Sequence, residues 1–143
     1  MKIYLDNCCY NRPFDDQSQI RIHLETQAKL YIQDKIKEGI YHLVWSYILD
    51  YENGKNPYEE KRLAISPWRA IASSFIAEET EEILTFAESL VLRGIKTYDA
   101  LHISCAVAAQ CDYFLTTDKK LLNTLISEIK IVSPIVFVDE MEG

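Results

Sequence analysis

The chain has 143 residues, 48% of them hydrophobic, and its formal net charge is −7, from 22 acidic and 15 basic residues. This composition suits a single domain over residues 1–143, and the charge excludes a protein that coats nucleic acid through electrostatics alone. No apolar run approaches the roughly 20 residues of a membrane span, and the first residues lack a secretory signal, so we expect a cytoplasmic protein with no membrane partner.

The first predicted strand covers residues 2–5 and ends at Asp6. The segment CCYNRPFDD over 8–16 is expected to be a loop at the lip of a pocket. Asp15 or Asp16 is then the expected cap of the helix that follows.

A long amphipathic helix is predicted over 17–38, with Gly39 just after its end. Its apolar residues recur near helical spacing and are expected to form the buried face. These residues are Ile20, Leu24, Ala28 and Tyr31.

The rest of the chain alternates between the two kinds of element. Strands are predicted over 41–46, 112–118 and 134–139. Helices are predicted over 47–52, from Pro57 with Asn56 as its cap to a break at Ser66-Pro67, and over 79–92, 98–110 and 119–126. The segment after Pro67 is left open between an extended and an irregular conformation. Strands that alternate with helices indicate an α/β protein, a three-layer α/β/α sandwich around a parallel sheet of four to five strands.

Acidic residues follow the predicted strands. Asp6 and Asp118 end two of them, and in a parallel sheet these ends lie on the same rim, where ligands bind. Asp99 lies in the first turn of a buried helix and Glu52 follows the second strand. Asp50 competes with Glu52, but residues two apart on a helix differ by about 200°, so one of them faces the pocket, and we choose Glu52.

Carboxylates that converge without a paired arginine repel one another unless a cation neutralises them. Mg²⁺ and Mn²⁺ prefer such oxygen ligands and can activate water for attack on a phosphodiester. The acidic set therefore predicts a Mg²⁺ or Mn²⁺ site and phosphodiester hydrolysis.

Four segments in this order resemble the acidic motifs of PIN domains: YLDNCCYNRP, WSYILDYENGKNP, TYDALHISCAV and DYFLTTDKKLL. The resemblance implies a metal-dependent ribonuclease fold, often the toxin of a bacterial toxin–antitoxin pair of the VapC type. It implies catalytic and metal-binding roles for Asp6, Glu52, Asp99 and Asp118. It also implies an RNA substrate and a small antitoxin protein as partner, and homodimers are common among domains of this size.

Polar residues near these acids are expected to support the site or contact the substrate. They are Asn7, Arg12, Ser46, Thr116 and Thr117. His102 lies three residues after Asp99, and we favour a hydrogen-bonded core histidine over a ligand or base. The tyrosines and Trp68 could stack on RNA bases, although packing is the preferred interpretation.

The cysteines are Cys8, Cys9, Cys105 and Cys111. Their spacing matches neither a zinc site nor a dense disulfide framework, so we expect reduced thiols.

Two other functions stay open. One is a catalytically inactive PIN-like module that binds RNA or protein. The other is a receiver-like or phosphohydrolase α/β domain, but those phosphatases usually have a second aspartate two residues after the first, where this chain has Cys8.

Overall fold

A central sheet of parallel strands runs through the computed structural model, which describes residues 1–142; Gly143, the last residue of the predicted domain, lies outside them. The strands are hydrogen-bonded in the order β3-β2-β1-β4-β5, and all pairs are parallel. They are β1 (Lys2–Leu5), β2 (His42–Ser46), β3 (Ser74–Ile76), β4 (Tyr113–Leu115) and β5 (Lys130–Val132). The predicted α/β class and parallel sheet are confirmed.

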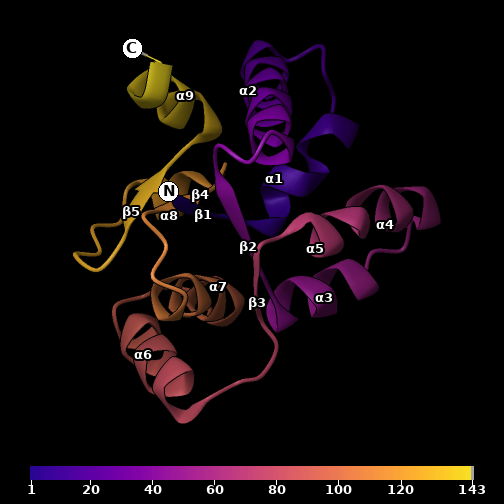
Figure 1. The fold of residues 1–143 in the computed structure, drawn as a ribbon. Coiled ribbons are helices and arrows are strands. Elements are labelled where there is room, and N and C mark those ends of the chain that lie inside the picture. Colours follow the sequence, from indigo (N-terminus) through magenta and orange to yellow (C-terminus); the bar gives the residue numbers. More distant parts are fainter. Residues whose placement is uncertain (143) are drawn as a thin grey trace.

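Helices cover both faces of this sheet, with α2 and α9 on one side and α6 and α7 on the other (Figure 1). Their bounds are α1 (Asn7–Asn11), η1 (Arg12–Phe14, a 3-10 helix), α2 (Ile20–Lys37), α3 (Tyr47–Gly54), α4 (Glu59–Ile65), α5 (Pro67–Ile71), α6 (Glu81–Leu92), α7 (Thr97–Ala108), α8 (Lys119–Leu122) and α9 (Pro134–Glu142). The expected three layers are therefore present. Among residues 1–142, no helix combines the length and the apolar character that crossing a bilayer requires.

The central strand β1 shows why the sheet forms. Ile3, Tyr4 and Leu5 are completely buried, because a parallel strand with helices on both faces has no side that meets water. The ring of Tyr4 stacks on Phe114 of β4, with centroids 5.4 Å apart. The core thus holds β1 and β4 side by side.

The order of the strands reverses at β1. The chain first adds β2 and β3 on one side of β1, and later adds β4 and β5 on the other. In open parallel sheets, ligands bind at the carboxyl ends of the strands where the order reverses. Asp6 follows β1 and Thr116 follows β4, so both lie at this point.

The prediction of a last strand over 134–139 is wrong. These residues lie in α9, and β5 at Lys130–Val132 is the last strand instead. Pro134 and Phe137 are buried three residues apart, which is helical spacing. A short apolar run cannot be assigned to strand or helix by its pattern alone, and contacts with the rest of the fold decided this one.

Several predicted boundaries also move. The expected loop over 8–16 contains most of α1 and all of η1, and Asp15 and Asp16 do not cap α2, which begins after Gln19. The remaining corrections concern helix lengths. The helix expected from Pro57 begins at Glu59, the helix expected over 119–126 ends at Leu122, and the segment left open after Pro67 forms α5 and β3.

The expected buried face of α2 is wrong as well. Ile20 and Leu24 are 78% and 50% exposed. The side of α2 that faces the protein instead carries Glu25, Lys29 and Gln33, all buried. Its apolar contribution to the core comes from Ile32 and Ile36 rather than from Ile20 and Leu24.

Candidate active site

Asp6 is held rigidly at the carboxyl end of β1. Its backbone N–H donates to the carbonyl of Leu115 at 2.9 Å, which ties it to β4. One carboxylate oxygen accepts from the backbone N–H of Asn7 at 2.8 Å, and the other accepts from the Thr116 hydroxyl at 2.9 Å. Asp6 is also the N-cap of α1, so the first turn after the strand fixes this side chain.

The backbone of Thr117 and Asp118, after β4, holds the two side chains that contact Asp6. The Thr116 hydroxyl also accepts from the backbone N–H of Asp118 at 3.1 Å. The Cys8 thiol lies 3.4 Å from an Asp6 oxygen and accepts from the backbone N–H of Thr117 at 3.3 Å. All four cysteines are free thiols, as expected. Cys8 is therefore a free thiol that contacts a candidate catalytic acid.

Glu52 faces this group from α3, whereas Asp50 does not. One Glu52 oxygen is hydrogen-bonded to Nε2 of His102, and the other accepts from the Asn7 amide at 3.5 Å. Asp50 accepts from the indole N–H of Trp45 at 2.8 Å and pairs with an arginine, Arg69, at 3.1 Å. The two carboxylates diverge as the 100° rotation per helical residue requires.

A buried chain of hydrogen bonds supports Glu52. Nδ1 of His102 lies 2.6 Å from the Tyr4 hydroxyl, which lies 2.6 Å from the Ser46 hydroxyl. An ionised carboxylate can only accept, so Nε2 of His102 donates to Glu52. In the neutral ring Nδ1 then accepts from Tyr4, and Tyr4 accepts from Ser46. His102 is a fully buried core histidine that orients Glu52, and Nε2 lies 4.0 Å from Asp6.

Sequence reasoning gave His102 little weight and expected Ser46 to act as polar support for the site. Ser46 is completely buried and caps α3 by accepting from the backbone N–H of Leu49 at 3.3 Å. It reaches the acids only through Tyr4 and His102. The signal that pointed to His102 was its position three residues after Asp99, on the same side of α7.

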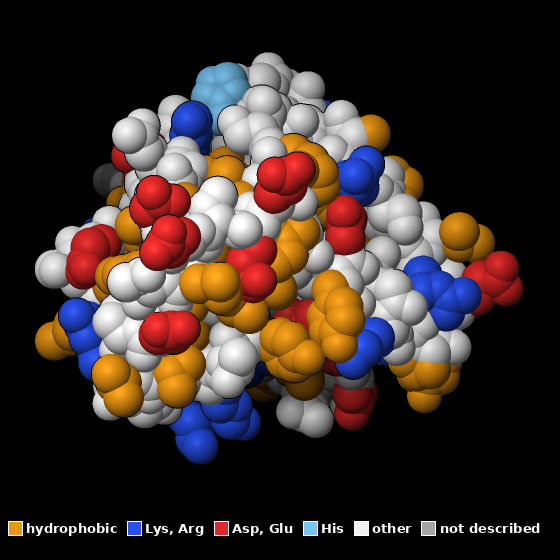
Figure 2. Space-filling model, turned by 90° about the horizontal axis from the view of Figure 1, so that it is seen from below, with side chains coloured by type: hydrophobic (Ala, Val, Ile, Leu, Met, Phe, Trp, Pro, Cys, Tyr) orange, Lys and Arg blue, Asp and Glu red, His pale blue; other side chains and the backbone are white. Residues whose placement is uncertain are grey.

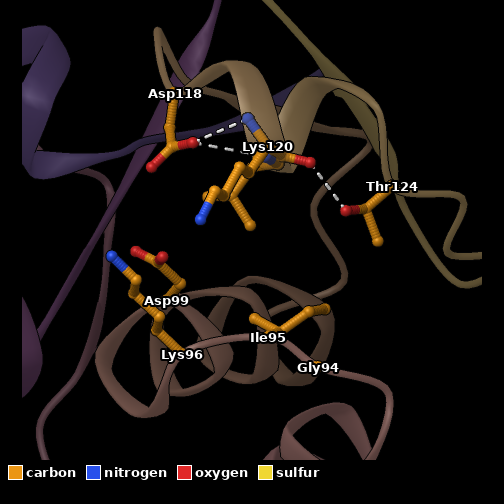
Figure 3. Close-up of a pocket in the computed structure, with 8 residues that line it drawn as sticks. Gly94, Ile95, Lys96, Asp99, Asp118, Lys120 and Thr124 are labelled. Atoms are coloured by element: carbon orange, nitrogen blue, oxygen red, sulfur yellow. Dashed lines mark hydrogen bonds between the residues drawn. The ribbon is translucent and has the colours of Figure 1, made fainter.

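Asp99 and Asp118 face each other across a small pocket of about 70 Å³. The Asp118 carboxylate caps α8 by accepting from the backbone N–H groups of Lys120 and Leu121, at 2.8 and 3.4 Å. The side chains of Lys96 and Lys120 extend toward the space between the two acids (Figure 3).

Gly94 lines the same pocket, and its φ of 95° lies in the left-handed region that favours glycine. This turn ends α6 and starts α7 at the site.

The charges of the acids act on one another. Burial raises the pKa of Asp99 to about 6, and the charges of Asp6, Asp118 and Glu52 add to the rise, while His102 opposes it. The structure therefore brings the predicted acidic residues within electrostatic reach of each other. An acid in such surroundings is one that a bound cation would stabilise.

The acids do not form a finished metal cage. In the part of the chain that the structure describes, no three His, Cys, Asp or Glu side chains are gathered closely enough to hold a metal ion. Their oxygen donors suit Mg²⁺ or Mn²⁺, which keep several waters and need few protein ligands. The chemistry of the donors fits such an ion, and their spacing requires that ligand side chains move or that waters complete the shell.

Two of the expected supporting residues serve other contacts. The Arg12 guanidinium pairs with Asp15 at 2.9 Å and with the buried Glu25 at 3.1 Å, so it joins η1 to α2. Thr117 is buried, and its carbonyl accepts from Arg21 at 3.3 Å. Asn7 stays at the site, where its side-chain oxygen is buried without a hydrogen-bond partner among the described residues.

Comparison with known proteins supports the fold. No protein-family model matches the chain, and no curated protein sequence does so at a significant level. Among solved structures, the chain is similar to a chain in the crystal structure of VapBC2 from Rickettsia felis bound to a DNA fragment from their promoter, with a TM-score of 0.56 and 15% sequence identity. The match covers 92% of this chain and 97% of the other. The fold implied by the PIN-domain resemblance is thereby confirmed.

Proposed function

We propose that this protein is a divalent-metal-dependent endoribonuclease that hydrolyses RNA phosphodiester bonds. The observation that carries the proposal is that four acids gather where the strand order reverses: Glu52 and Asp6 lie near Nε2 of His102, and Asp99 and Asp118 line one pocket. Burial and the charges of the other three acids raise the pKa of Asp99 to about 6, which agrees with this arrangement. Carboxylates that gather at a ligand-binding rim suit a cation and a phosphate substrate.

Asp6, Glu52, Asp99 and Asp118 would hold the Mg²⁺ or Mn²⁺ ion. When bound, such an ion activates a water and stabilises charge on phosphate oxygens. The protein keeps its own acids in position: Thr116 and Asn7 hold Asp6, and His102 holds Glu52. Asp118 uses one oxygen to cap α8 and leaves the other for the pocket.

Two lysines and one asparagine would contact the substrate. Lys96 and Lys120 extend toward the space between Asp99 and Asp118, where they can hold phosphate oxygens (Figure 3). The unpaired side-chain oxygen of Asn7 is buried, so Asn7 must turn its side chain outward before this oxygen accepts a hydrogen bond from a ribose hydroxyl. Arg12 is not part of this set, because its guanidinium is already paired with Asp15 and Glu25.

We further propose that the chain is the toxin of a toxin–antitoxin pair, acting in the cytoplasm. The likeness to a chain of the VapBC2 complex supports this role. A net charge of −7 favours a partner that donates a basic segment, and an arginine placed among Asp6, Glu52 and Asp99 would neutralise them. Co-purification of a small basic protein that stops RNA cleavage is the expected result, and full activity in excess partner would contradict the toxin role.

The nuclease proposal is tested with purified protein and RNA in the presence of Mg²⁺ or Mn²⁺. Cleavage should stop with EDTA, and Asp6→Asn and Asp99→Asn should each lower the rate by more than about 100-fold, since even the outer partners of metal ligands are worth 10- to 100-fold. Asp50→Asn is the matched control, because Asp50 lies on α3 but contacts Trp45 and Arg69. Circular dichroism should show unchanged folds. Equal rates for Asp99→Asn and the wild type would refute the proposal.

The second candidate is a catalytically inactive PIN-like module that binds RNA or protein. The absence of a finished three-ligand cage among residues 1–142 favours it. Calorimetric titration with Mn²⁺ separates the two functions: a nuclease should bind the ion and lose that binding in Asp99→Asn, whereas a scaffold should show no Mn²⁺ affinity.

A further inference from the structure

Two exposed tyrosines directly precede acidic residues of the site in the chain. Tyr51 precedes Glu52 on α3, and Tyr98 precedes Asp99 on α7. Their exposed fractions are 43% and 46%. Tyr4, Tyr10 and Tyr41 are buried, so exposure sorts these two from the tyrosines that build the core.

The two tyrosines and one lysine form a contiguous group, which we call the Tyr51–Tyr98 pair with Lys55. The ring centroids are 5.7 Å apart, and the Tyr98 hydroxyl donates to the Tyr51 hydroxyl at 3.3 Å. The Lys55 ammonium lies 4.3 Å from the centroid of the Tyr51 ring. The hydrogen bond between the hydroxyls joins α3 to α7, the two helices that carry Glu52 and Asp99.

Packing alone does not account for this group. A tyrosine that only fills space is usually buried with its hydroxyl bonded into the structure, as Tyr4 is through Ser46 and His102. The hydroxyls of Tyr51 and Tyr98 instead bond to each other at the surface. Two large rings stay half-exposed where they link the helices that carry Glu52 and Asp99.

We propose that the Tyr51–Tyr98 pair with Lys55 is a nucleobase subsite for single-stranded RNA. An unstacked base next to the scissile phosphate stacks on the tyrosine rings, and the Lys55 ammonium moves on its flexible stem from the Tyr51 ring to the adjoining phosphate. This inference rests on the proposed nuclease function, because it places the base relative to the acids of that site.

The charge of the protein explains why stacking matters here. The net charge is −7, and the face that carries α6 and α7 shows exposed hydrophobic side chains among acidic ones, with lysine and arginine mostly toward the edges (Figure 2). Attraction of phosphates by the whole surface is therefore weak. Stacking on aromatic rings does not depend on charge and can supply affinity at such a surface.

The test measures binding of a short fluorescent single-stranded RNA by anisotropy, in Mn²⁺, with Asp6→Asn in every protein so that the RNA stays intact. Tyr51→Leu and Tyr98→Leu should each weaken binding by about 5- to 100-fold, whereas Tyr51→Phe and Tyr98→Phe should stay within about twofold because they keep the ring. Tyr58→Leu is the matched control, since Tyr58 is 61% exposed and has the Lys61 ammonium 4.5 Å from its ring.

Two further measurements identify the base and the phosphate. An abasic nucleotide placed at each position of the RNA in turn should weaken binding at one position as much as Tyr98→Leu does. At that position the abasic RNA and the leucine variant together should weaken binding no more than either change alone. Lys55→Met should reduce the salt dependence of log K by about 0.7, the value for one phosphate contact with a single strand.

Several outcomes would overturn the subsite. These are wild-type affinity in the leucine variants, equal losses in the leucine and phenylalanine variants, an equal loss in Tyr58→Leu, tighter binding of double-stranded RNA or DNA, or no RNA binding by any of the proteins. Cleavage by the chain with Asp6 intact is scored separately. Loss of binding in the leucine variants without any cleavage would support the subsite and refute the nuclease, and the reverse pattern would refute the subsite alone.

Discussion

Asp99 is a residue whose position at the candidate site lowers the stability of the folded protein. It lies in the first turn of α7, where a helix dipole favours a negative charge, yet its pKa is raised to about 6. Burial and three neighbouring acids therefore outweigh the dipole. Without a bound cation, the folded protein holds this carboxylate in a place where the ionised form is disfavoured.

We expect Asp99→Asn to stabilise the metal-free protein at neutral pH. The folded pKa of about 6 lies above the ordinary value of 3.8, so the folded state binds the proton more tightly. Wild-type stability should therefore fall as the pH rises from about 4 to about 6 and then level off. Because Asp99 is partly exposed, the gain at pH 7 should be about 1 kcal/mol.

Urea unfolding in EDTA at pH 3.5 and pH 7 checks this expectation. The variant and the wild type should match at the lower pH and differ at the higher one. A variant that is less stable at pH 7 would show that Asp99 makes favourable contacts instead.

At the scale of elements, α2 carries two buried charged residues, of which one has an ion-pair partner and the other lies between aromatic rings. Glu25 is buried and is paired with the guanidinium of Arg12 at 3.1 Å. Lys29, one turn further, is buried between aromatic rings, with its ammonium 5.6 Å from the centroid of Tyr10 and 6.0 Å from that of Trp68. Burial lowers the pKa of Lys29 to about 8. A paired charge is tolerated inside a protein more readily than a charge held only by ring faces.

Lys29→Met should stabilise the protein by about 1 to 3 kcal/mol at pH 7, because it removes the cost of a charged group at a buried position. In the wild type the unfolded chain keeps its proton up to about pH 10.5, while the folded protein loses it near pH 8. Wild-type stability should therefore rise between these values, and the variant should lack this rise. Urea titrations from pH 7 to pH 10 measure both effects, and a parallel rise in the variant would contradict the assignment.

The burial of side chains in the C-terminal helix α9 distinguishes it from the strand that the sequence suggested. Phe137 is completely buried and meets Tyr41 and Tyr113 edge to face, with centroids 5.1 and 5.0 Å away. Ile135 is 36% exposed. In a strand, residues 135 and 137 would share one face and be buried alike.

Phe137→Ala should lower the free energy of unfolding by about 3 to 5 kcal/mol, as expected for a buried aromatic ring. Ile135→Ala is the matched control and should cost less than about 1 kcal/mol, because its side chain is partly solvated. Chemical denaturation measures both. Similar losses in the two variants would argue for the strand.

At the scale of the whole molecule, the strand order places the site. Because β4 returns to the opposite side of β1 from β2, the residues after these strands meet at one edge, with α7 beside them. Four separate parts of the chain supply the acids of the site, which are Asp6, Glu52, Asp99 and Asp118. Repulsion among these carboxylates lowers the free energy of unfolding of the whole protein, and a bound divalent ion would remove this repulsion.

We therefore expect Mn²⁺ to raise the thermal unfolding midpoint of the whole protein. An ion that binds only the folded state stabilises it by about 2.7 kcal/mol at a concentration 100 times the Kd, which corresponds to several degrees in a chain of this size. EDTA should reverse the shift, and Asp99→Asn should abolish it. A single transition is expected for one domain, and two separate transitions, or no response to millimolar Mn²⁺, would contradict this picture.

Light scattering in the same buffer tests the expected homodimer.

The sequence by itself determined the alternation of strands and helices, the parallel sheet and the carboxylates that follow its strands. These features depend on local periodicity and on residues next to each other in the chain, and the structure agrees about the sheet. Helix geometry also predicted that only one of Asp50 and Glu52 faces the pocket, and the contacts of the two side chains show that it is Glu52.

The tertiary structure alone decided which face of α2 is buried, that 134–139 forms a helix, and that Ser46, Tyr4 and His102 link the core to Glu52. It also decided which tyrosines remain at the surface. Each of these depends on contacts between residues far apart in the chain. Such contacts set the burial and hydrogen bonding of a side chain, and a local pattern does not contain them.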